Sequence, residues 1–137
     1  MRFKQYLNEN SWFKGSKVNR GKKPLTLYRG ISKTVEDRHA SAALGIFATP
    51  NLNTAKAYAG GSGKLLKVYM KIVNPYYMEY DEIQEIENKQ DAIKLKKELM
   101  KKGHDGIFLK PMKGTGAMPT AVSEYIAFNK NQVKEVE

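Results

Sequence analysis

The sequence contains no cysteine, and this absence excludes disulfides, thiol chemistry and zinc sites of the cysteine type. Its two histidines, His39 and His104, have no carboxylate or cysteine partner at metal-binding spacing, so we expect no metal. No apolar run approaches the roughly 20 residues that a membrane-spanning helix needs, and the N-terminus lacks the long apolar centre of a signal peptide. We therefore expect no membrane contact, and a reducing cytoplasm fits this composition.

Acidic residues are scarce: the sequence has 14 Asp and Glu and 24 Lys and Arg, which gives a formal net charge of +10. Residues 1–38 alone contain ten basic and three acidic residues. A field of this sign attracts acidic partners and accelerates association with them, so nucleic acid or a protein that binds nucleic acid is a natural partner. Scattered surface lysines that only keep the protein in solution explain the charge equally well.

The length of 137 residues and the hydrophobic content of 41% predict one folded unit with its own core. Short apolar runs bounded by turn-forming residues predict strands at residues 25–29, 45–49, 65–73, 107–109 and 122–128. Helical patterns with Asn capping residues predict helices at 51–59 and at 81–102, the second broken near Asn88. Short strands around a few helices indicate an α+β fold.

Turn-forming residues mark where we expect these elements to end. Gly30 is expected to end the first strand and Asn74-Pro75 the third, because proline cannot donate a ladder hydrogen bond. Residues 129–137 are expected to form a polar end. Residues 1–24 are predicted to form a basic, partly irregular N-terminal segment, and residues 25–137 the folded domain.

Three polar side chains far apart in the sequence each lie in or beside an apolar run. They are Arg29 in Leu27-Tyr28-Arg29-Gly30, Thr49 in Phe47-Ala48-Thr49-Pro50, and Glu124 in Ser123-Glu124-Tyr125. An arginine can hold a pyrophosphate by two parallel charged hydrogen bonds. A carboxylate can orient a ribose hydroxyl and stabilise a developing cation. The pattern predicts one site, assembled from several strands, that splits a dinucleotide at a glycosidic bond.

Each of these residues also has a plainer interpretation. Arg29 can be a surface ion-pair partner, Thr49 a helix cap, and Glu124 a solvent-facing residue of an edge strand. Only the coincidence of the three favours catalysis.

In order and spacing, these motifs resemble the mono-ADP-ribosyltransferases of the arginine–serine–glutamate type, in the small form common in bacteriophages. The resemblance covers most of the chain, residues 25–133, and further includes the helix with Ala55 and Tyr58, the strand at 68–75, and Lys102-Gly103-His104-Asp105-Gly106-Ile107. It implies an ADP-ribosyltransferase-like domain over residues 25–137. The implied fold is a pair of roughly perpendicular antiparallel β-sheets with flanking helices and an NAD cleft between them.

The resemblance also implies a role for each motif residue. It places Arg29 on the phosphates and the nicotinamide ribose, gives Thr49 the hydroxyl that supports the catalytic carboxylate, and makes Glu124 that carboxylate. Tyr58 is expected to stack on the nicotinamide, although a tyrosine on a helix face is more often a core residue. NAD is the implied substrate, and no metal is needed. The residues expected to bind NAD are Arg29, Gly30, Phe47, Thr49, Tyr58 and Glu124.

The sequence departs from the family pattern in two places. Where serine, threonine and serine are usual, it reads Phe47-Ala48-Thr49. Val122 stands where arginine-modifying members carry Glu and asparagine- or glutamine-modifying members carry Gln, so the sequence leaves the acceptor residue open. The loop at 110–121, at the place of the family's substrate-recognition loop, is basic and polar, which suits an acidic protein or nucleic acid.

We expect a monomeric mono-ADP-ribosyltransferase that moves ADP-ribose from NAD to a host macromolecule, with protein favoured over nucleic acid, as a phage effector in the host cytoplasm. Two alternatives stay open. One is a non-enzymatic basic binding protein or inhibitor of a host complex on the same fold, and the other is an NAD glycohydrolase. Leu7-Asn8-Glu9 resembles the cleavage signal of tailed-phage head proteases, which would fit packaging in a phage head and injection with the genome.

Overall fold

The computed structural model describes residues 12–32, 40–112 and 121–136, and these residues form the α+β fold that the sequence predicts. The strands are β1 (Asn19–Arg20), β2 (Lys23–Pro24), β3 (Leu27–Ile31), β4 (Ile46–Ala48), β5 (Lys64–Met70), β6 (Pro75–Met78), β7 (Gly106–Leu109), β8 (Glu124–Ala127) and β9 (Val133–Glu135). The α-helices are α2 (Leu52–Ala59), α3 (Tyr80–Gln84) and α4 (Lys89–Lys101), and the 3-10 helices are η2 (Ala40–Leu44) and η3 (Lys130–Gln132). Across the described ranges, no helix is both long enough and apolar enough to cross a membrane.

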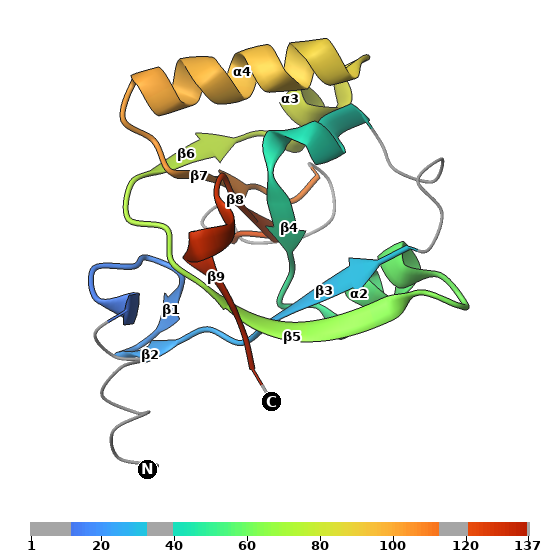
Figure 1. The fold of residues 1–137 in the computed structure, drawn as a ribbon, viewed down its shortest axis with the longest axis vertical. Coiled ribbons are helices and arrows are strands. Elements are labelled where there is room, and N and C mark those ends of the chain that lie inside the picture. Colours follow the sequence, from blue (N-terminus) through green and yellow to red (C-terminus); the bar gives the residue numbers. More distant parts are fainter. Residues whose placement is uncertain (1–11, 33–39, 113–120, 137) are drawn as a thin grey trace.

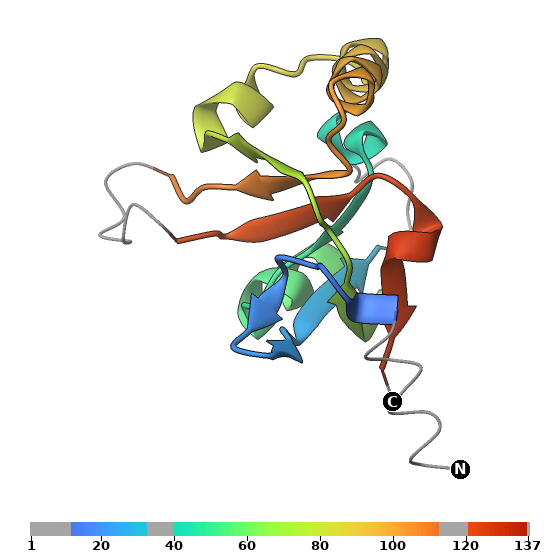
Figure 2. The ribbon, with the colours of Figure 1, turned by 90° about the vertical axis from the view of Figure 1, so that its left-hand side faces the viewer.

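Two sheets, stacked one above the other, carry the fold. One contains three strands in the order β3-β5-β9, and the other contains four in the order β4-β8-β7-β6. Helices α3 and α4 lie above the four-stranded sheet, and the three-stranded sheet lies below it with α2 (Figures 1 and 2). Strands β1 and β2 form a separate pair near the N-terminal end.

The expectation of purely antiparallel sheets is wrong for one pair of strands, because β6 and β7 run parallel. Between these two strands the chain passes through α3 and α4. A helical crossover of this kind returns the chain to the sheet in its original direction, whereas a tight hairpin would reverse it. All other strand pairs in the described part of the chain are antiparallel.

The four-stranded sheet separates two hydrophobic cores, and its central strands β7 and β8 are buried on both faces. Alternate residues of β7 enter different cores, Phe108 the inner one and Ile107 and Leu109 the outer one. The inner core, between the sheets, also includes Leu27, Val68, Met70, Tyr125 and Ala127. The outer core, under the helices, also includes Leu44, Met78, Leu99, Ile126 and Phe128. Burial on both faces explains why β7, and β8 after Glu124, read as continuous apolar runs.

The predicted helices are confirmed, together with the asparagine caps that mark them. The Asn51 side chain accepts hydrogen bonds from the backbone N–H of Asn53 (2.9 Å) and Thr54 (3.2 Å) at the start of α2. The Asn88 side chain accepts from the N–H of Asp91 (2.9 Å) at the start of α4. The predicted break near Asn88 is therefore the boundary between α3 and α4.

Three expected ends are wrong. Strand β3 continues through Gly30, which pairs with Leu65, to Ile31. Pro75 begins a strand that the sequence did not predict, and β6 tolerates it because β6 is an edge strand with one unpaired side. The expected polar end contains η3 and β9, and β9 pairs with β5. Short strands such as β9 show no clear periodicity, so only their pairing in the folded chain reveals them.

Residues 12–24 are fixed to the inner core. Val18 is fully buried, and the Ser16 hydroxyl donates to the carbonyl of Met70 (3.1 Å) and accepts from the N–H of Ile72 (3.1 Å). The Trp12 indole N–H donates to the carbonyl of Asn131 (3.1 Å). The predicted cleavage motif at residues 7–9 lies outside the described residues.

Gly30 provides a test of how closely β3 and α2 pack. A Cβ at this position would overlap the carbonyl oxygen of Ala55 and lie 2.7 Å from the backbone nitrogen of Ala59. We expect Gly30→Ala to destabilise the protein by about 3 kcal/mol or more and to lower the Tm by roughly 10 °C, because backbone cannot move aside as a side chain can. Gly61→Ala is the matched control, since no atom of the described residues, apart from the residue itself and its chain neighbours, lies within 4 Å of its Cβ position. An equal Tm for the two variants would contradict this packing.

Candidate active site

The two sheets meet at Tyr28 and Thr49. The Tyr28 N–H donates to the carbonyl of Thr49 (2.7 Å), and the Thr49 N–H donates to the carbonyl of Tyr28 (2.9 Å). These bonds form an isolated antiparallel bridge between the segments of β3 and β4. Strand β4 pairs in turn with β8, with Ala48 opposite Tyr125. The bridge therefore brings β3, which carries Arg29, to the end of β8 that carries Glu124.

A pocket opens at this junction. All six residues that the sequence predicts for NAD binding line it: Arg29, Gly30, Phe47, Thr49, Tyr58 and Glu124. The lining also includes residues that sequence reasoning did not select as site residues: Tyr28, Ile31, Ser32, Ser41, Ala42, Gly45 and Ala48. Ser41 and Ala42 come from η2, whose small residues carry no chemical signal in the sequence. The predicted residues thus share one pocket, and their individual roles stay predictions.

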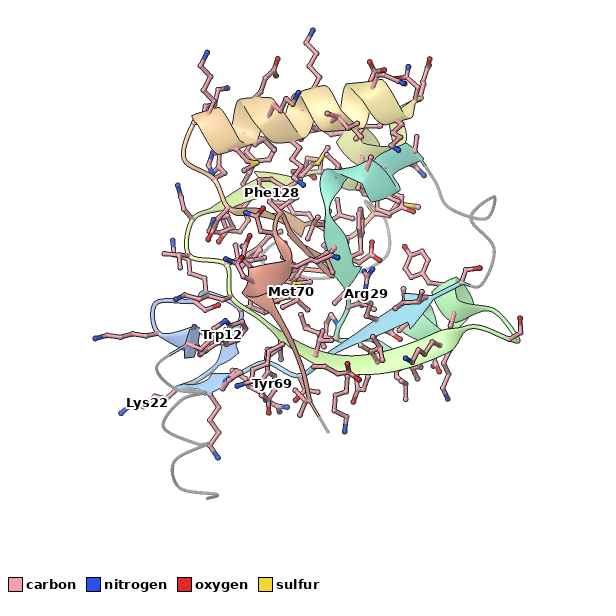
Figure 3. All side chains as sticks on the ribbon, in the orientation of Figure 1. Trp12, Lys22, Arg29, Tyr69, Met70 and Phe128 are labelled. Carbon is pink, nitrogen blue, oxygen red and sulfur yellow. The ribbon has the colours of Figure 1, made fainter. Side chains whose placement is uncertain are left out.

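Arg29 extends from β3 towards β4 (Figure 3). Its Nη1 donates a hydrogen bond to the backbone carbonyl of Phe47 (3.0 Å), which fixes the orientation of the planar guanidinium group. A fixed guanidinium loses little conformational freedom when it binds an anion. Phe47 takes part in the site through this carbonyl, while its side chain packs against the outer core.

Glu124 is the buried acid of the pocket, with 6% of its surface exposed. Its Oε1 atom is buried and has no hydrogen-bond partner among the described residues. Burial raises the pKa of this carboxyl group, and a hydrogen bond from Tyr58 partly offsets the rise. A buried carboxylate oxygen without a partner costs stability, so its presence in a pocket makes Glu124 a candidate functional group.

Tyr58 projects from α2 into the same pocket and remains 46% exposed. Burial raises the pKa of its hydroxyl well above the ordinary value, and the nearby Glu124 charge raises it further. The hydroxyl therefore keeps its proton and can donate to Glu124 throughout the neutral range. Half of the side chain stays accessible for contact with a ligand, so Tyr58 is not the core residue of the plainer interpretation.

Thr49 is 2% exposed and uses its hydroxyl in two hydrogen bonds. The hydroxyl donates to the carbonyl of Ser123 (2.9 Å) and accepts from the N–H of Asn51 (3.1 Å). The first bond holds the backbone immediately before Glu124, and the second fixes the turn into α2. This geometry offers a route by which Thr49 can support Glu124 through the backbone.

Val122 and the loop at 110–121, the two features that bear on the acceptor, have different surroundings. Val122 packs against the inner core and is not part of the pocket lining. In the loop at 110–121, residues 113–120 lie outside the described part of the structure. Lys110 forms an ion pair with Glu79 (3.3 Å), and the partial exposure of both side chains makes this pair weak.

A comparison with known protein families identifies the chain. The model of the family described as ADP-ribosyltransferase in polyvalent proteins matches residues 19–137. The chain belongs to this family. No curated protein matches the chain. The resemblance to ADP-ribosyltransferases is thereby confirmed, and the chain is an NAD-dependent transferase.

No group of three or more metal-ligating side chains occurs among the residues that the structure describes in this ADP-ribosyltransferase. His104 lies with its Nδ1 3.3 Å from the carbonyl of Asn74 and its ring edge-on to Tyr76, which is a structural environment. His39 lies outside the described residues.

Replacement of Tyr58 by phenylalanine tests the hydrogen bond to Glu124. The bond favours the ionised carboxylate, so its loss should raise the pKa of Glu124. We expect the acid limb of the pH–rate profile for nicotinamide release to move to higher pH in Tyr58→Phe. Tyr77→Phe removes a hydroxyl from an exposed tyrosine outside the pocket and should leave the profile unchanged. An unshifted acid limb in Tyr58→Phe would show that the bond does not tune the carboxylate.

Glu124→Gln tests whether the protein loses stability to keep this acid. The pKa of Glu124 is raised in the folded state. The contribution of this group to folding stability is therefore fully present below the ordinary carboxyl pKa, and it is lost as pH rises through the raised pKa. Glutamine carries no charge at any pH. We therefore expect Glu124→Gln to have a higher Tm than the unmodified protein at about pH 8, with the difference shrinking towards about pH 4.

Glu87→Gln, at an exposed position, is the control for this melting experiment. A Tm for Glu124→Gln that is lower than that of the unmodified protein at neutral pH would show that the buried carboxylate is stabilising.

Proposed function

We propose that the enzyme cleaves NAD at the bond between nicotinamide and ribose and transfers the ADP-ribose to a host macromolecule. The observation that supports this most directly is that Arg29 and Glu124, 95 positions apart in the sequence, line one pocket. The guanidinium group suits the phosphates, and the buried carboxylate suits the ribose hydroxyl and the positive charge that develops as the bond breaks.

The chemistry requires little else from the protein. The nicotinamide nitrogen in NAD already carries a positive charge, so it takes the bonding electron pair and leaves as a neutral molecule without a strong acid. The electron-poor ribose carbon is then attacked by a nucleophile of the acceptor, which loses its proton to solvent or to a base. Glu124 stabilises the cationic transition state, while Arg29 fixes the phosphates so that the ribose lies against Glu124.

We propose a protein as the acceptor, and phage infection as the setting in which this transfer acts in the host cytoplasm. The net charge of +10 supports an acidic or nucleic-acid-associated target. The phage setting rests on the small size of the chain and on the Leu7-Asn8-Glu9 motif, which also motivates the proposal of packaging in a phage head. The family assignment favours enzymatic action over a purely binding role.

NAD hydrolysis without transfer is the second candidate, and the position of Val122 favours it. This side chain packs against the core and cannot hydrogen-bond an acceptor. Water then competes with the acceptor for the ribose carbon unless the acceptor is held by other surfaces. The ratio of free ADP-ribose to covalent adduct, measured with labelled NAD and host lysate, separates the two candidates.

Glu124→Gln is the direct test of the proposed mechanism. We expect the rate of nicotinamide release to fall by about 10²–10³-fold, as when other electrostatic catalytic groups are removed. Glu135→Gln, on the exposed part of β9, should retain the rate. A Glu124→Gln variant that remains folded and cleaves NAD at the original rate would refute the mechanism.

A further inference from the structure

The charged residues of this transferase are divided unevenly between its two layers. Among the described residues, the ranges 12–32 and 40–78 contain ten Lys and Arg and no acidic residue. The range 79–98, which includes α3 and most of α4, contains seven acidic residues and four lysines. Because acidic residues are absent from the first two ranges and present in the third, positive potential is greater on the layer of β1, β2, β3, α2 and β5.

A compact basic feature in this layer is the pair of strands β1 and β2, which we call the basic hairpin (residues 19–24). Arg20 and Lys23 face each other across the pair, and the turn between them is Gly21-Lys22. Gly21 has a φ of +66°, which glycine adopts readily and which two-residue hairpin turns require. Arg20, Lys22 and Lys23 are all exposed, and Lys22 points away from the body of the molecule (Figure 3).

The basic hairpin is held rigidly at its base. Val18, immediately before the hairpin, is fully buried. Its backbone carbonyl accepts a hydrogen bond from the N–H of Leu25, which immediately follows the hairpin (3.2 Å). The Lys17 N–H donates to the carbonyl of Ile72 (2.8 Å), and the buried Ser16 hydroxyl links the same segment to Met70. The three exposed cations are therefore presented on an ordered support, which lowers the entropy lost when a ligand binds.

The side chains of the segment that carries the hairpin distinguish between two classes of anionic partner. Protein interfaces draw their affinity from buried aromatic and apolar anchors with a polar rim. Within residues 12–32, no large hydrophobic side chain is exposed. A phosphate backbone needs only cations and hydrogen-bond donors in a fixed arrangement. The hairpin offers charge without apolar anchors, and this combination fits nucleic acid better than a protein.

We propose that the basic hairpin binds the phosphate backbone of nucleic acid, independently of base sequence. Binding through phosphates releases counterions, so affinity should fall steeply with salt, with a slope of about −0.9 per phosphate contact on a duplex. Arg20, Lys22 and Lys23 make these contacts. The catalytic pocket plays no part in this binding.

Fluorescence anisotropy with a labelled duplex of about 20 base pairs and mixed sequence, titrated at several salt concentrations, tests the proposal. The triple variant R20Q/K22Q/K23Q should bind more weakly, and the slope of log K against log salt should become shallower by about 2.7. The matched control is K94Q/K97Q/K101Q, which removes the same charge from exposed positions of α4 and should change the slope by less than about 1. For a single-stranded oligonucleotide of the same sequence, the unmodified protein and the two triple variants should rank in the same order of affinity.

Equal slopes for the two triple variants would overturn the proposal, because net charge alone would then explain binding. The proposal would also be overturned if the protein bound neither the duplex nor the single strand at about 50 mM salt. Binding of a poly-glutamate peptide, without binding of either oligonucleotide, would overturn it as well. Nicotinamide release should be unchanged in R20Q/K22Q/K23Q. Failure of the hairpin proposal is therefore separable from failure of the proposed transfer reaction.

Discussion

The paired hydrogen bonds between Tyr28 and Thr49 are the constraint on which the site depends. Without them, Arg29 would belong to one sheet and Glu124 to the other, and side-chain contacts such as the Arg29–Phe47 hydrogen bond would be left to set the distance between them. Thr49 extends the connection through its hydroxyl, which binds the carbonyl of Ser123. One residue thus ties three strand segments together by backbone and side chain. Positions set by backbone hydrogen bonds are preorganised, and preorganisation is what electrostatic catalysis requires.

The position of Glu124 at the start of a wholly buried strand conflicts with stability. Strand β8 is otherwise apolar, and a carboxylate there is desolvated, which its raised pKa reflects. The Tyr58 hydroxyl satisfies part of this group and leaves Oε1 without a described partner. Proteins tolerate such groups mainly where function needs them, and the surrounding core must then supply the stability that the site loses. The two hydrophobic cores on either side of the four-stranded sheet have this role.

The sequence predicts the parts of this fold that depend on interactions between residues close together in the chain. Asn51 and Asn88 mark helix starts because capping is a local interaction, and the motif residues share a pocket because each stands at an apolar run that becomes a strand. Features that depend on tertiary pairing escape prediction: the parallel β6–β7 pair, the strand β9, and the contribution of η2 to the pocket wall. The sequence also could not show that Thr49 acts on the backbone at Ser123, because that contact spans 74 positions.

The apolar surroundings of Val122 and the charge of the basic hairpin bear on the same problem, which is how an acceptor reaches the ribose carbon. Residue 122 offers no polar group, so the pocket does not position an acceptor through that side chain. Binding energy from remote parts of a large substrate can supply the positioning instead, and a macromolecule provides such remote parts where a small molecule does not. Exposed cations on a rigid hairpin away from the pocket suit this purpose. Within the proposed function, this reasoning favours a macromolecular acceptor associated with nucleic acid, since the hairpin and the pocket could then hold one assembly at two places.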